Sequence, residues 1–268
     1  LIGTLVVFSQ IQFMRKQSLG ISIAQTLIVQ PPQVGLDSNY QSKMAALKAT
    51  LLQDPAIKEV TISSSIPGQA VGGNAGGIRL ITQDAKAENQ YRFFFTDYNF
   101  MNYYQMKIIA GRSFSSKYPE DVANKAVVIT KKAAEQLGIT DPQQAINKRI
   151  FFWVDTCQIV GVAADYHQES LQQGYDQIIM RLAPNHPGYI SISLNKQNAD
   201  KVINKTKQTW NSLMAGNTFD YFFLDDHFNQ QYKNDQQFGK IFMIFTSMAI
   251  FIACLGLFGL ASFTTHQR

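Results

Sequence analysis

Twenty-three consecutive residues without a charge stand near the end of this chain. Residues 241–263 read IFMIFTSMAIFIACLGLFGLASF. Because a helix rises about 1.5 Å per residue, this run would extend roughly 34 Å, enough to cross a hydrocarbon core of about 30 Å. A helix in the core of a soluble protein is rarely apolar on every side over such a length. The sequence therefore predicts a transmembrane helix over residues 241–263.

Small side chains recur on one side of this predicted helix. They belong to Ala249, Ala253 and Gly256. A ridge of small residues lets a second helix approach closely within a membrane. We therefore expect another membrane helix to pack against this ridge.

The first fourteen residues, LIGTLVVFSQIQFM, are also apolar but end at Arg15. They lack the basic start and the small-residue cleavage site of a secretory signal peptide. Residues 1–14 are therefore interpreted as the end of a transmembrane helix whose beginning precedes residue 1. The chain then corresponds to a fragment of a larger membrane protein, in which a long loop domain connects two membrane helices.

Charged residues are concentrated between the two apolar ends. All nineteen acidic residues and twenty of the twenty-four basic residues lie between Asp37 and Asp235, so this body is nearly neutral although the whole chain has a net charge of +5. A nearly neutral body offers no electrostatic basis for binding nucleic acid. Four basic residues flank the apolar ends, as is typical of a membrane boundary: Arg15, Lys16, Lys240 and Arg268.

The body has the composition and the pattern of a folded domain. Charged residues make up only 16% of the chain, and its two cysteines cannot form a disulfide scaffold. Near the start of the body, residues 26–29 form a short apolar strand and residues 59–63 alternate as another. Between them, one face of a helix is apolar, with these residues at helical spacing: Tyr40, Met44, Leu47 and Leu51.

The same strand–helix–strand order recurs near the end of the body. It comprises a strand over residues 189–194, a helix over residues 198–213 and a strand over residues 219–224. Asn198 is the expected N-cap of that helix. Two such units separated by a long insertion predict an α+β fold with a split ferredoxin-like layer, in which the helices cover one face of the sheet.

The insertion between the two units is rich in strands. We expect strands over residues 78–82, 91–96 and 126–129, and then a helix that Thr130 caps and Gly138 ends. Two further strands, over residues 149–154 and 157–163, are expected to form a hairpin about Asp155-Thr156. The insertion is therefore predicted to be a second, smaller subdomain.

Seven segments keep a recognisable order over nearly the whole chain. They read LIGTLVVFSQIQFMRKQSLGI, QDPAIKEVTISSSIPG, YYQMKIIAGRSFS, AVVITKKAAEQLG, IVGVAADYHQESL, FDYFFLDDHFNQQYKNDQQFGKIF and CLGLFGLASFTTHQR. No single segment is decisive, but the ordered set resembles the MacB/FtsX-type ABC transporter permeases. It is most similar to the second half of the eight-helix permeases typical of Bacteroidetes.

The resemblance implies a periplasmic core domain with a porter-like β-α-β layer and an inserted sabre-like subdomain. The expected segments are a membrane-helix end (1–14), a first porter-like part (21–67), the sabre-like insertion (68–185), a second porter-like part (186–225), a stalk helix (226–240) and a transmembrane helix (241–263). It also implies a multi-pass inner-membrane protein whose large domain lies in the periplasm. Its implied partners are a cytoplasmic ABC ATPase, a second permease half in a homodimer or pseudo-dimer, and a periplasmic adaptor or substrate protein.

Asp165, His167 and Glu169 are spaced closely enough to suggest a metal or acid–base site. On a strand they would lie on one side. However, a metal site needs three or four convergent ligands, and no other histidine lies near in the sequence. We interpret them as a polar turn after a buried strand. The resembling family has a similar Asp-x-His turn without known catalysis.

Two other segments resemble ligand sites. Asp225 and Asp226 precede His227, but their position before a helix suggests that one of them caps its first turn. Residues 72–77 read GGNAGG and lack the Lys-Ser/Thr pair of a phosphate-binding loop. A flexible loop is the expected structure there.

Three residues in a partly aromatic helical segment are interpreted as packing residues, and not as a ligand stack. They are Asp97, Tyr103 and Tyr104. Gly111-Arg112 is expected to form a turn, with Arg112 at the surface or at a subdomain contact. No catalytic residue, metal ligand or cofactor is therefore assigned.

Residues 226–242 can continue as one helix without a proline. A stalk face recurs at near-helical spacing and comprises Phe228, Tyr232, Asp235, Gly239 and Phe242. A continuous stalk would transmit rotation or tilt between the membrane and the outer domain, although Gly239 costs about 1 kcal/mol relative to alanine. In the resembling family a separate cytoplasmic ATPase drives such movement.

The leading hypothesis is a non-enzymatic permease subunit of an ABC-type efflux or mechanotransmission complex. The alternative is a membrane-anchored extracytoplasmic module that binds a ligand or peptide. A membrane-bound hydrolase is disfavoured, because the sequence has no nucleophile elbow, zinc motif or convincing carboxylate pair. Further transmembrane helices and a neighbouring ATPase gene would favour the permease.

Overall fold

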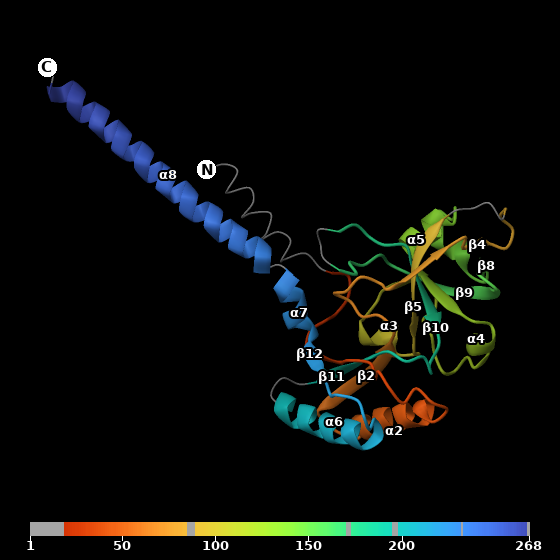
Figure 1. The fold of residues 1–268 in the computed structure, drawn as a ribbon. Coiled ribbons are helices and arrows are strands. Elements are labelled where there is room, and N and C mark those ends of the chain that lie inside the picture. Colours follow the sequence, from red (N-terminus) through yellow and green to blue (C-terminus); the bar gives the residue numbers. More distant parts are fainter. Residues whose placement is uncertain (1–18, 85–88, 170–172, 195–197, 232, 267–268) are drawn as a thin grey trace. The chain divides into compact units, whose positions relative to one another are not determined.

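The computed structural model of the chain describes residues 19–84, 89–169, 173–194, 198–231 and 233–266. The chain divides into two compact units. The larger is Ser18–His227, and the smaller comprises Leu1–Gln17 and Phe228–Arg268. All the described strands belong to the larger unit (Figure 1). The predicted membrane-helix end at residues 1–14 lies outside the described residues.

Four strands form the layer that the repeated strand–helix–strand order predicts: β1 (Thr26–Val29), β2 (Ile57–Ser63), β11 (Tyr189–Leu194) and β12 (Tyr221–Phe223). Their order in the sheet is β12-β1-β11-β2, and each strand is antiparallel to its neighbours. The register places Ile192 opposite both Leu27 and Val60, so apolar side chains from three strands share one face. This is the order of a split ferredoxin-like layer, and the predicted topology is confirmed.

Helices α2 (Tyr40–Leu52) and α6 (Ala199–Leu213) cover that face of the sheet (Figure 1). Asn198 directly precedes α6, but its side chain makes no capping hydrogen bond. It is the N-cap residue by position, as predicted, but its backbone (φ −114°, ψ 15°) is not in the extended conformation from which a cap side chain reaches the first turn. In α2 the buried side chains are those expected from the helical spacing: Tyr40, Met44, Leu47 and Leu51.

The insertion continues the same sheet. Its strands are β3 (Gly73–Gly76), β4 (Arg79–Leu80), β5 (Gln90–Thr96), β6 (Ile108–Gly111), β7 (Val127–Thr130), β8 (Arg149–Phe152), β9 (Asp155–Ala163) and β10 (Ile178–Leu182). From β2 the order runs β5-β10-β7-β9-β8-β4, with β3 beside β5 and β6 beside β9. Strand β10 is parallel to β5, and β9 is parallel to β7.

Two of the hydrophobic clusters among the described residues divide between the insertion and the first layer, whereas other fully buried side chains, among them Ile28, Phe94 and Tyr104, belong to neither cluster. One cluster of buried side chains belongs to β1, β2, β11, α2 and α6, and the other belongs to the strands of the insertion. Strands β2 and β5 share only the residue pair Ser63–Thr96 in the sheet. The insertion is rich in strands, as predicted, and has a buried cluster of its own, but its division from the rest of the larger unit as a subdomain stays a prediction.

Short helices complete the inserted subdomain: α3 (Phe100–Tyr103), α4 (Glu120–Ala123), α5 (Lys131–Gln136) and η1 (Pro142–Ala145). Helix α5 has the ends that the sequence predicts. Thr130 Oγ1 accepts a hydrogen bond from Ala133 N at 3.3 Å, and Gly138 follows the helix with a φ of +82°. A positive φ there suits glycine, which has no Cβ to clash with the turn.

Two local predictions in the insertion are wrong. Residues 72–77, expected as a loop, contain β3, which pairs with β5. Glycine fits this pairing, because a Cβ at Gly73 would lie 2.3 Å from the carbonyl oxygen of Phe93. The β8–β9 hairpin turns at Trp153-Val154, two residues before the predicted turn, and Trp153 has a φ of +56°.

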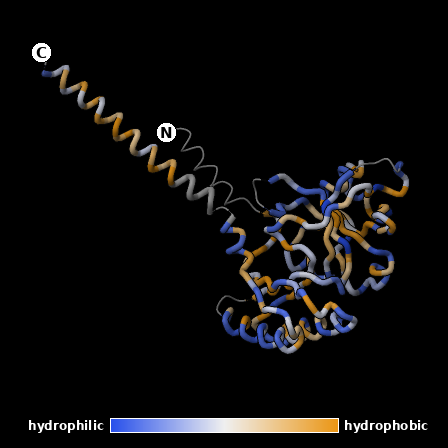
Figure 2. The backbone as a smooth tube through the Cα atoms, viewed as in Figure 1, coloured by the Kyte–Doolittle hydropathy of each residue, from blue (hydrophilic) through white to orange (hydrophobic). Residues whose placement is uncertain are grey.

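After β12 the chain forms α7 (Leu224–Gln231) and α8 (Lys233–His266). Among the described helices, only α8 is long and apolar enough to cross a membrane, judged by the length and composition of Ile241–His266. Every side chain in that stretch is exposed except that of Thr246, which is half-buried. Figure 2 shows the apolar residues all along it. The predicted apolar helix is confirmed as a candidate membrane span.

Candidate coupling site

Hydroxyl groups in the apolar part of α8 donate hydrogen bonds to carbonyl oxygens of the same helix. Thr246 Oγ1 donates to Phe242 O at 2.7 Å, and Ser247 Oγ donates to Met243 O at 2.8 Å. Near the other end, Thr264 Oγ1 donates to Leu260 O at 2.9 Å. Hydrocarbon offers polar groups no hydrogen-bond partner, so these internal bonds suit a helix within a bilayer.

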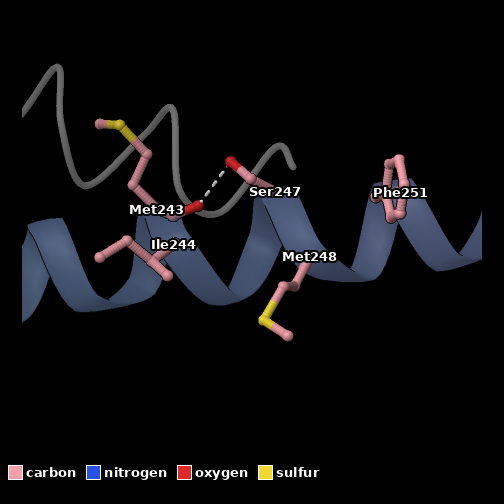
Figure 3. A pocket seen from close by; sticks show the side chains of 5 residues that line it. All are labelled: Met243, Ile244, Ser247, Met248 and Phe251. Atoms are coloured by element: carbon pink, nitrogen blue, oxygen red, sulfur yellow. Dashed lines mark hydrogen bonds between the residues drawn. The ribbon is translucent and has the colours of Figure 1, made fainter.

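One side of α8 borders a shallow apolar space of about 610 Å³. Figure 3 shows the side chains around it, with the Ser247 hydroxyl turned back onto Met243 O. The lining residues are Met243, Ile244, Ser247, Met248 and Phe251. Apart from the Ser247 hydroxyl, which is already bonded, these side chains have no hydroxyl, amide or charged group to hold a polar ligand. The surface is therefore suited to an apolar environment.

The predicted ridge and stalk residues fall on α7 and α8. Ala249, Ala253 and Gly256 are exposed on α8, and a Cβ at Gly256 would meet nothing within 4 Å. Packing of another helix against this ridge therefore stays a prediction.

The stalk residues divide between the two helices. Phe228 lies in α7 and is buried, whereas Phe242 in α8 is 62% exposed. Asp235 and Gly239 lie in the helical backbone of α8. Tyr232, between the two helices, lies outside the described residues, so a continuous stalk stays a prediction.

The side chains of Asp165, His167 and Glu169 bind three different groups of the protein. Asp165 accepts from the backbone N of Lys132 at 2.7 Å, and Glu169 accepts from Gln173 Nε2 at 3.1 Å. His167 Nδ1 lies 3.1 Å from Gln173 O. No group of three metal-binding side chains converges among the described residues.

Burial raises the pKa of the Asp165 carboxyl above its usual value, while the bond from Lys132 N opposes that rise. Burial disfavours the ionised form of a carboxyl group because it removes hydration. A raised carboxyl pKa is also found in active sites. Here the carboxylate lies at the first turn of α5, where it binds a backbone N–H that has no partner within the helix. Its geometry accounts for a structural role.

The carboxylates of Asp225 and Asp226 lie inside the first turn of α7, which begins at Leu224. Neither occupies the position before the helix, but Asp225 Oδ1 accepts a hydrogen bond from the backbone N of Asp226 at 3.1 Å within that first turn. Both still lie where the positive end of the helix dipole favours negative charge. His227 instead binds a distant loop, because its Nε2 lies 3.0 Å from Gly68 O.

Asp97 is a buried ion-pair residue with several hydrogen bonds. Lys48 Nζ lies 2.7 Å from its carboxylate, and the Thr61 hydroxyl and the Ile62 backbone N also donate to it. Tyr104 is fully buried, and its hydroxyl is bonded to that of Ser191 at 2.8 Å. Tyr104 is therefore a buried packing residue, as expected, whereas Asp97 is held by hydrogen bonds and an ion pair.

Arg112, expected either at the surface or at a subdomain contact, contacts two side chains of the insertion. Its Nη1 and Nη2 bind the two carboxylate oxygens of Asp121 at 2.6 and 2.7 Å. The guanidinium carbon lies 3.7 Å from the centre of the Tyr118 ring. Two parallel bonds and a stacked ring fix the guanidinium within the inserted subdomain.

The fold and its candidate membrane helix define a membrane-associated α/β domain. The sequence pattern of the MacB-like periplasmic core domain matches residues 1–209. The chain therefore belongs to the family of MacB-like periplasmic core domains. This family is a domain of ABC-type transporter permeases and is generally non-catalytic, and membership implies association with a membrane and a cytoplasmic ATPase.

One solved structure shows the same fold, and a second is similar over much of the chain. The periplasmic region of MacB from Actinobacillus actinomycetemcomitans is 16% identical and superposes with a TM-score of 0.53, covering 83% of this chain and 99% of that one. The extracellular domain of the noncanonic ABC-type transporter YknZ from Gram-positive bacteria is 15% identical, with a TM-score of 0.49, and covers 73% of this chain and 96% of that one. No sequence among the curated proteins matches.

Proposed function

We propose that this chain is a permease subunit of a MacB/FtsX-type ABC transporter. In this proposal it is non-catalytic and couples ATP hydrolysis by a cytoplasmic partner to a conformational change of its periplasmic domain, for efflux or mechanotransmission. The observation that supports it best is helix α8, which follows the folded domain in the chain and exposes apolar side chains from Ile241 onward. A helix of this kind is a direct covalent connection between bilayer and domain.

The stalk is the proposed coupling element. Its residues are Phe228, Tyr232, Asp235, Gly239 and Phe242. Proline in place of Asp235 would remove a backbone donor and clash with the preceding turn, which costs roughly 3 kcal/mol or more and kinks a helix. Alanine at the same position keeps the helix and removes only the charge.

These two variants test the proposed function in the full-length permease purified with its ATPase. We expect Asp235→Pro to abolish ATP-dependent transport or signalling while basal ATP hydrolysis persists. Asp235→Ala should remain active. If an Asp235→Pro permease is normally inserted, normally abundant and fully functional, a rigid stalk is not the coupling element.

The location and assembly belong to the same proposal. The domain would lie in the periplasm of a multi-pass inner-membrane protein, divided as residues 21–67 and 186–225 (porter-like) and 68–185 (sabre-like). The ridge of Ala249, Ala253 and Gly256 would pack against another membrane helix, in the same permease half or in its homodimer or pseudo-dimer partner. Cysteine cross-linking from Ala253 within membranes tests this contact. A complete absence of cross-links along this face would contradict it.

One cavity favours the second candidate function, a ligand-binding module. It has a volume of about 150 Å³ and lies among α2, the residues after β5 and the connection between β10 and β11. Lys48 and His186 line it, beside the buried carboxylate of Asp97. If it binds small carboxylates or peptides, these should raise the unfolding temperature of the wild-type chain more than that of Lys48→Met. Lys43→Met, in the same helix but outside the cavity, is the matched control.

A further inference from the structure

The first described residues of the larger unit lie directly on the turn after β9. The backbone N of His167 donates to Leu19 O at 3.0 Å. The next residue, Gly20, has a φ of +81°, and a Cβ there would lie 3.2 Å from Tyr166 Cβ and 3.3 Å from Asp165 O. Glycine is therefore needed at this position for both its conformation and its contact.

His227, the last residue of the larger unit, is linked to the same turn through Gly68. His227 Nε2 lies 3.0 Å from Gly68 O, and Gly68 N donates to Gln168 O at 2.6 Å. The His227 ring also packs against Phe222, with the ring centres 5.2 Å apart. The segment before the folded unit thus contacts residues 165–168 directly and the segment after it is linked to them through Gly68, although the two segments are about two hundred residues apart in the sequence.

The side chain of Gln168 binds the loop that contains Gly68. Its side chain is only 3% exposed, and its Nε2 donates to Ile66 O at 2.8 Å and to Gln69 O at 2.9 Å. Its Oε1 accepts from the Tyr166 hydroxyl at 2.7 Å. A buried amide whose donors and acceptor are all bonded holds its neighbours in one arrangement, because any shift leaves a buried polar group unpaired.

Asp165 attaches the same turn to the inserted subdomain. Its carboxylate binds Lys132 N at the start of α5, and the turn itself continues β9, whose side chains form part of the subdomain core. Four consecutive residues therefore contact three different parts of the larger unit.

We propose that residues 165–168 form a junction that couples the incoming residues, 19–20, to the outgoing residue, His227, and both to the inserted subdomain. The junction deepens the proposed function and rests on it: if the membrane helices drive the domain, their movement reaches the inserted subdomain through this turn. Tyr166, His167 (through its backbone) and Gln168 act as positioning residues, and none of them performs chemistry.

The test measures amide hydrogen exchange on the full-length permease in detergent micelles, without nucleotide. His227→Phe keeps the ring and removes the bond to Gly68 O, and Gly20→Ala places a methyl group against Tyr166. We expect each variant to accelerate exchange about fivefold, the factor for one lost hydrogen bond, in the loop at residues 64–72 and also in the turn at residues 165–169. Exchange in the core strands should be unchanged.

Each variant has a matched control outside the junction. Gly35→Ala introduces the same methyl group at a φ of +75°, but with nothing within 4 Å of it. His186→Phe removes another bond between a histidine and a carbonyl oxygen, to Pro187. If each variant accelerates exchange only in the segment it touches, or if the controls act as strongly, the junction does not couple the two ends and the proposal is wrong.

A second arm separates the junction from the proposed function. In the permease with its ATPase, ATP should change exchange within the inserted subdomain of the wild type, and His227→Phe should reduce that change at least fivefold while ATP hydrolysis persists. A wild type without any ATP response over residues 19–227 would refute the proposed function, whereas the nucleotide-free arm alone still decides whether the junction couples the two ends. An ATP response that survives both variants would refute the junction as its route.

Discussion

Removing the Arg112 side chain should destabilise the inserted subdomain alone. Arg112 holds both oxygens of Asp121, whose side chain is only 2% exposed. That bond to Asp121 raises the pKa of the guanidinium, which therefore remains charged at every pH at which the domain is folded. Arg112→Ala would leave the Asp121 carboxylate buried without its cation.

The size of the effect follows from the burial of the two partners. Breaking a fully buried pair by removing one member costs about 3–5 kcal/mol. The Arg112 side chain is 32% exposed, so water can reach the vacated site and reduce the cost. We expect about 2–3 kcal/mol for Arg112→Ala, including roughly 0.5–1 kcal/mol for the lost stacking on Tyr118. Arg112→Lys keeps the charge without the planar fork and should cost about 1 kcal/mol.

The two tryptophans allow each core to be followed separately. Trp210 is completely buried in the first layer, whereas Trp153 lies on the β8–β9 hairpin, 5.3 Å between ring centres from Phe93. Urea unfolding is followed by fluorescence in variants that retain one tryptophan, the other being replaced by phenylalanine. With a slope of about 2 kcal/mol per M, Arg112→Ala should lower the midpoint of the Trp153 transition by roughly 1 M. The Trp210 transition should move much less.

The exposed Arg149, at the start of β8, provides the control. Arg149→Ala should change the free energy of unfolding by no more than about 0.5 kcal/mol. A loss below 0.5 kcal/mol for Arg112→Ala would show that the Asp121 carboxylate is rehydrated without cost. An equal shift in both tryptophan signals would show that the two cores unfold as one, and the reasoning from separate cores would be wrong.

Three further measurements test other parts of the chain. The intact protein should remain with the membrane during alkaline extraction, because residues 241–266 are apolar and exposed; recovery in the supernatant would contradict this. Calorimetry should detect no micromolar binding of ATP, since residues 73–76 are a strand paired with β5 and not a phosphate-binding loop. Hydrogen bonds from Lys125 and Arg181 hold the pKa of Asp155 below its usual value, so this stabilisation is complete above about pH 4 and is lost as the pH falls through the lowered pKa. Asp155→Asn should therefore unfold at a lower temperature than the wild type at pH 7, and the difference should shrink toward pH 2.

The parts of the fold that follow local patterns could be predicted from the sequence. The spacing of Tyr40, Met44, Leu47 and Leu51 defines one helix face, and all four side chains are buried. The repeated strand–helix–strand order was sufficient to predict the split layer, because a right-handed connection between parallel strands leaves a place for an antiparallel strand between them. The apolar helix at the end of the chain needed only its length and its lack of charge.

Features that depend on distant partners could not be predicted in this way. Strand β3 reads GNAG and has almost no side chains, so its only signal is its pairing with β5, in which Gly73 lies opposite Phe93, twenty residues later. Gln168 is polar and adjoins a motif rich in ionisable residues, yet it is buried because Ile66 O and Gln69 O, about one hundred residues earlier, bind its amide. A hydrogen bond between residues so far apart leaves no periodic pattern in the sequence around Gln168. Asp165 and His167 have the residue types of a metal site but are interpreted from the sequence as part of a polar turn, and each binds a backbone group.

Polar contacts connect the first layer to the insertion where the two share little of the sheet ladder. Strands β2 and β5 share one residue pair in the sheet, Ser63 and Thr96. Asp97, directly after β5, compensates: its backbone N donates to Ile62 O, and its carboxylate accepts from Ile62 N and from Lys48 of α2. Apolar contacts are insensitive to direction, whereas these bonds fail when their geometry changes. If the proposed function is right, we expect movement applied at one end of the domain to act first on these polar contacts, while the apolar side chains remain packed.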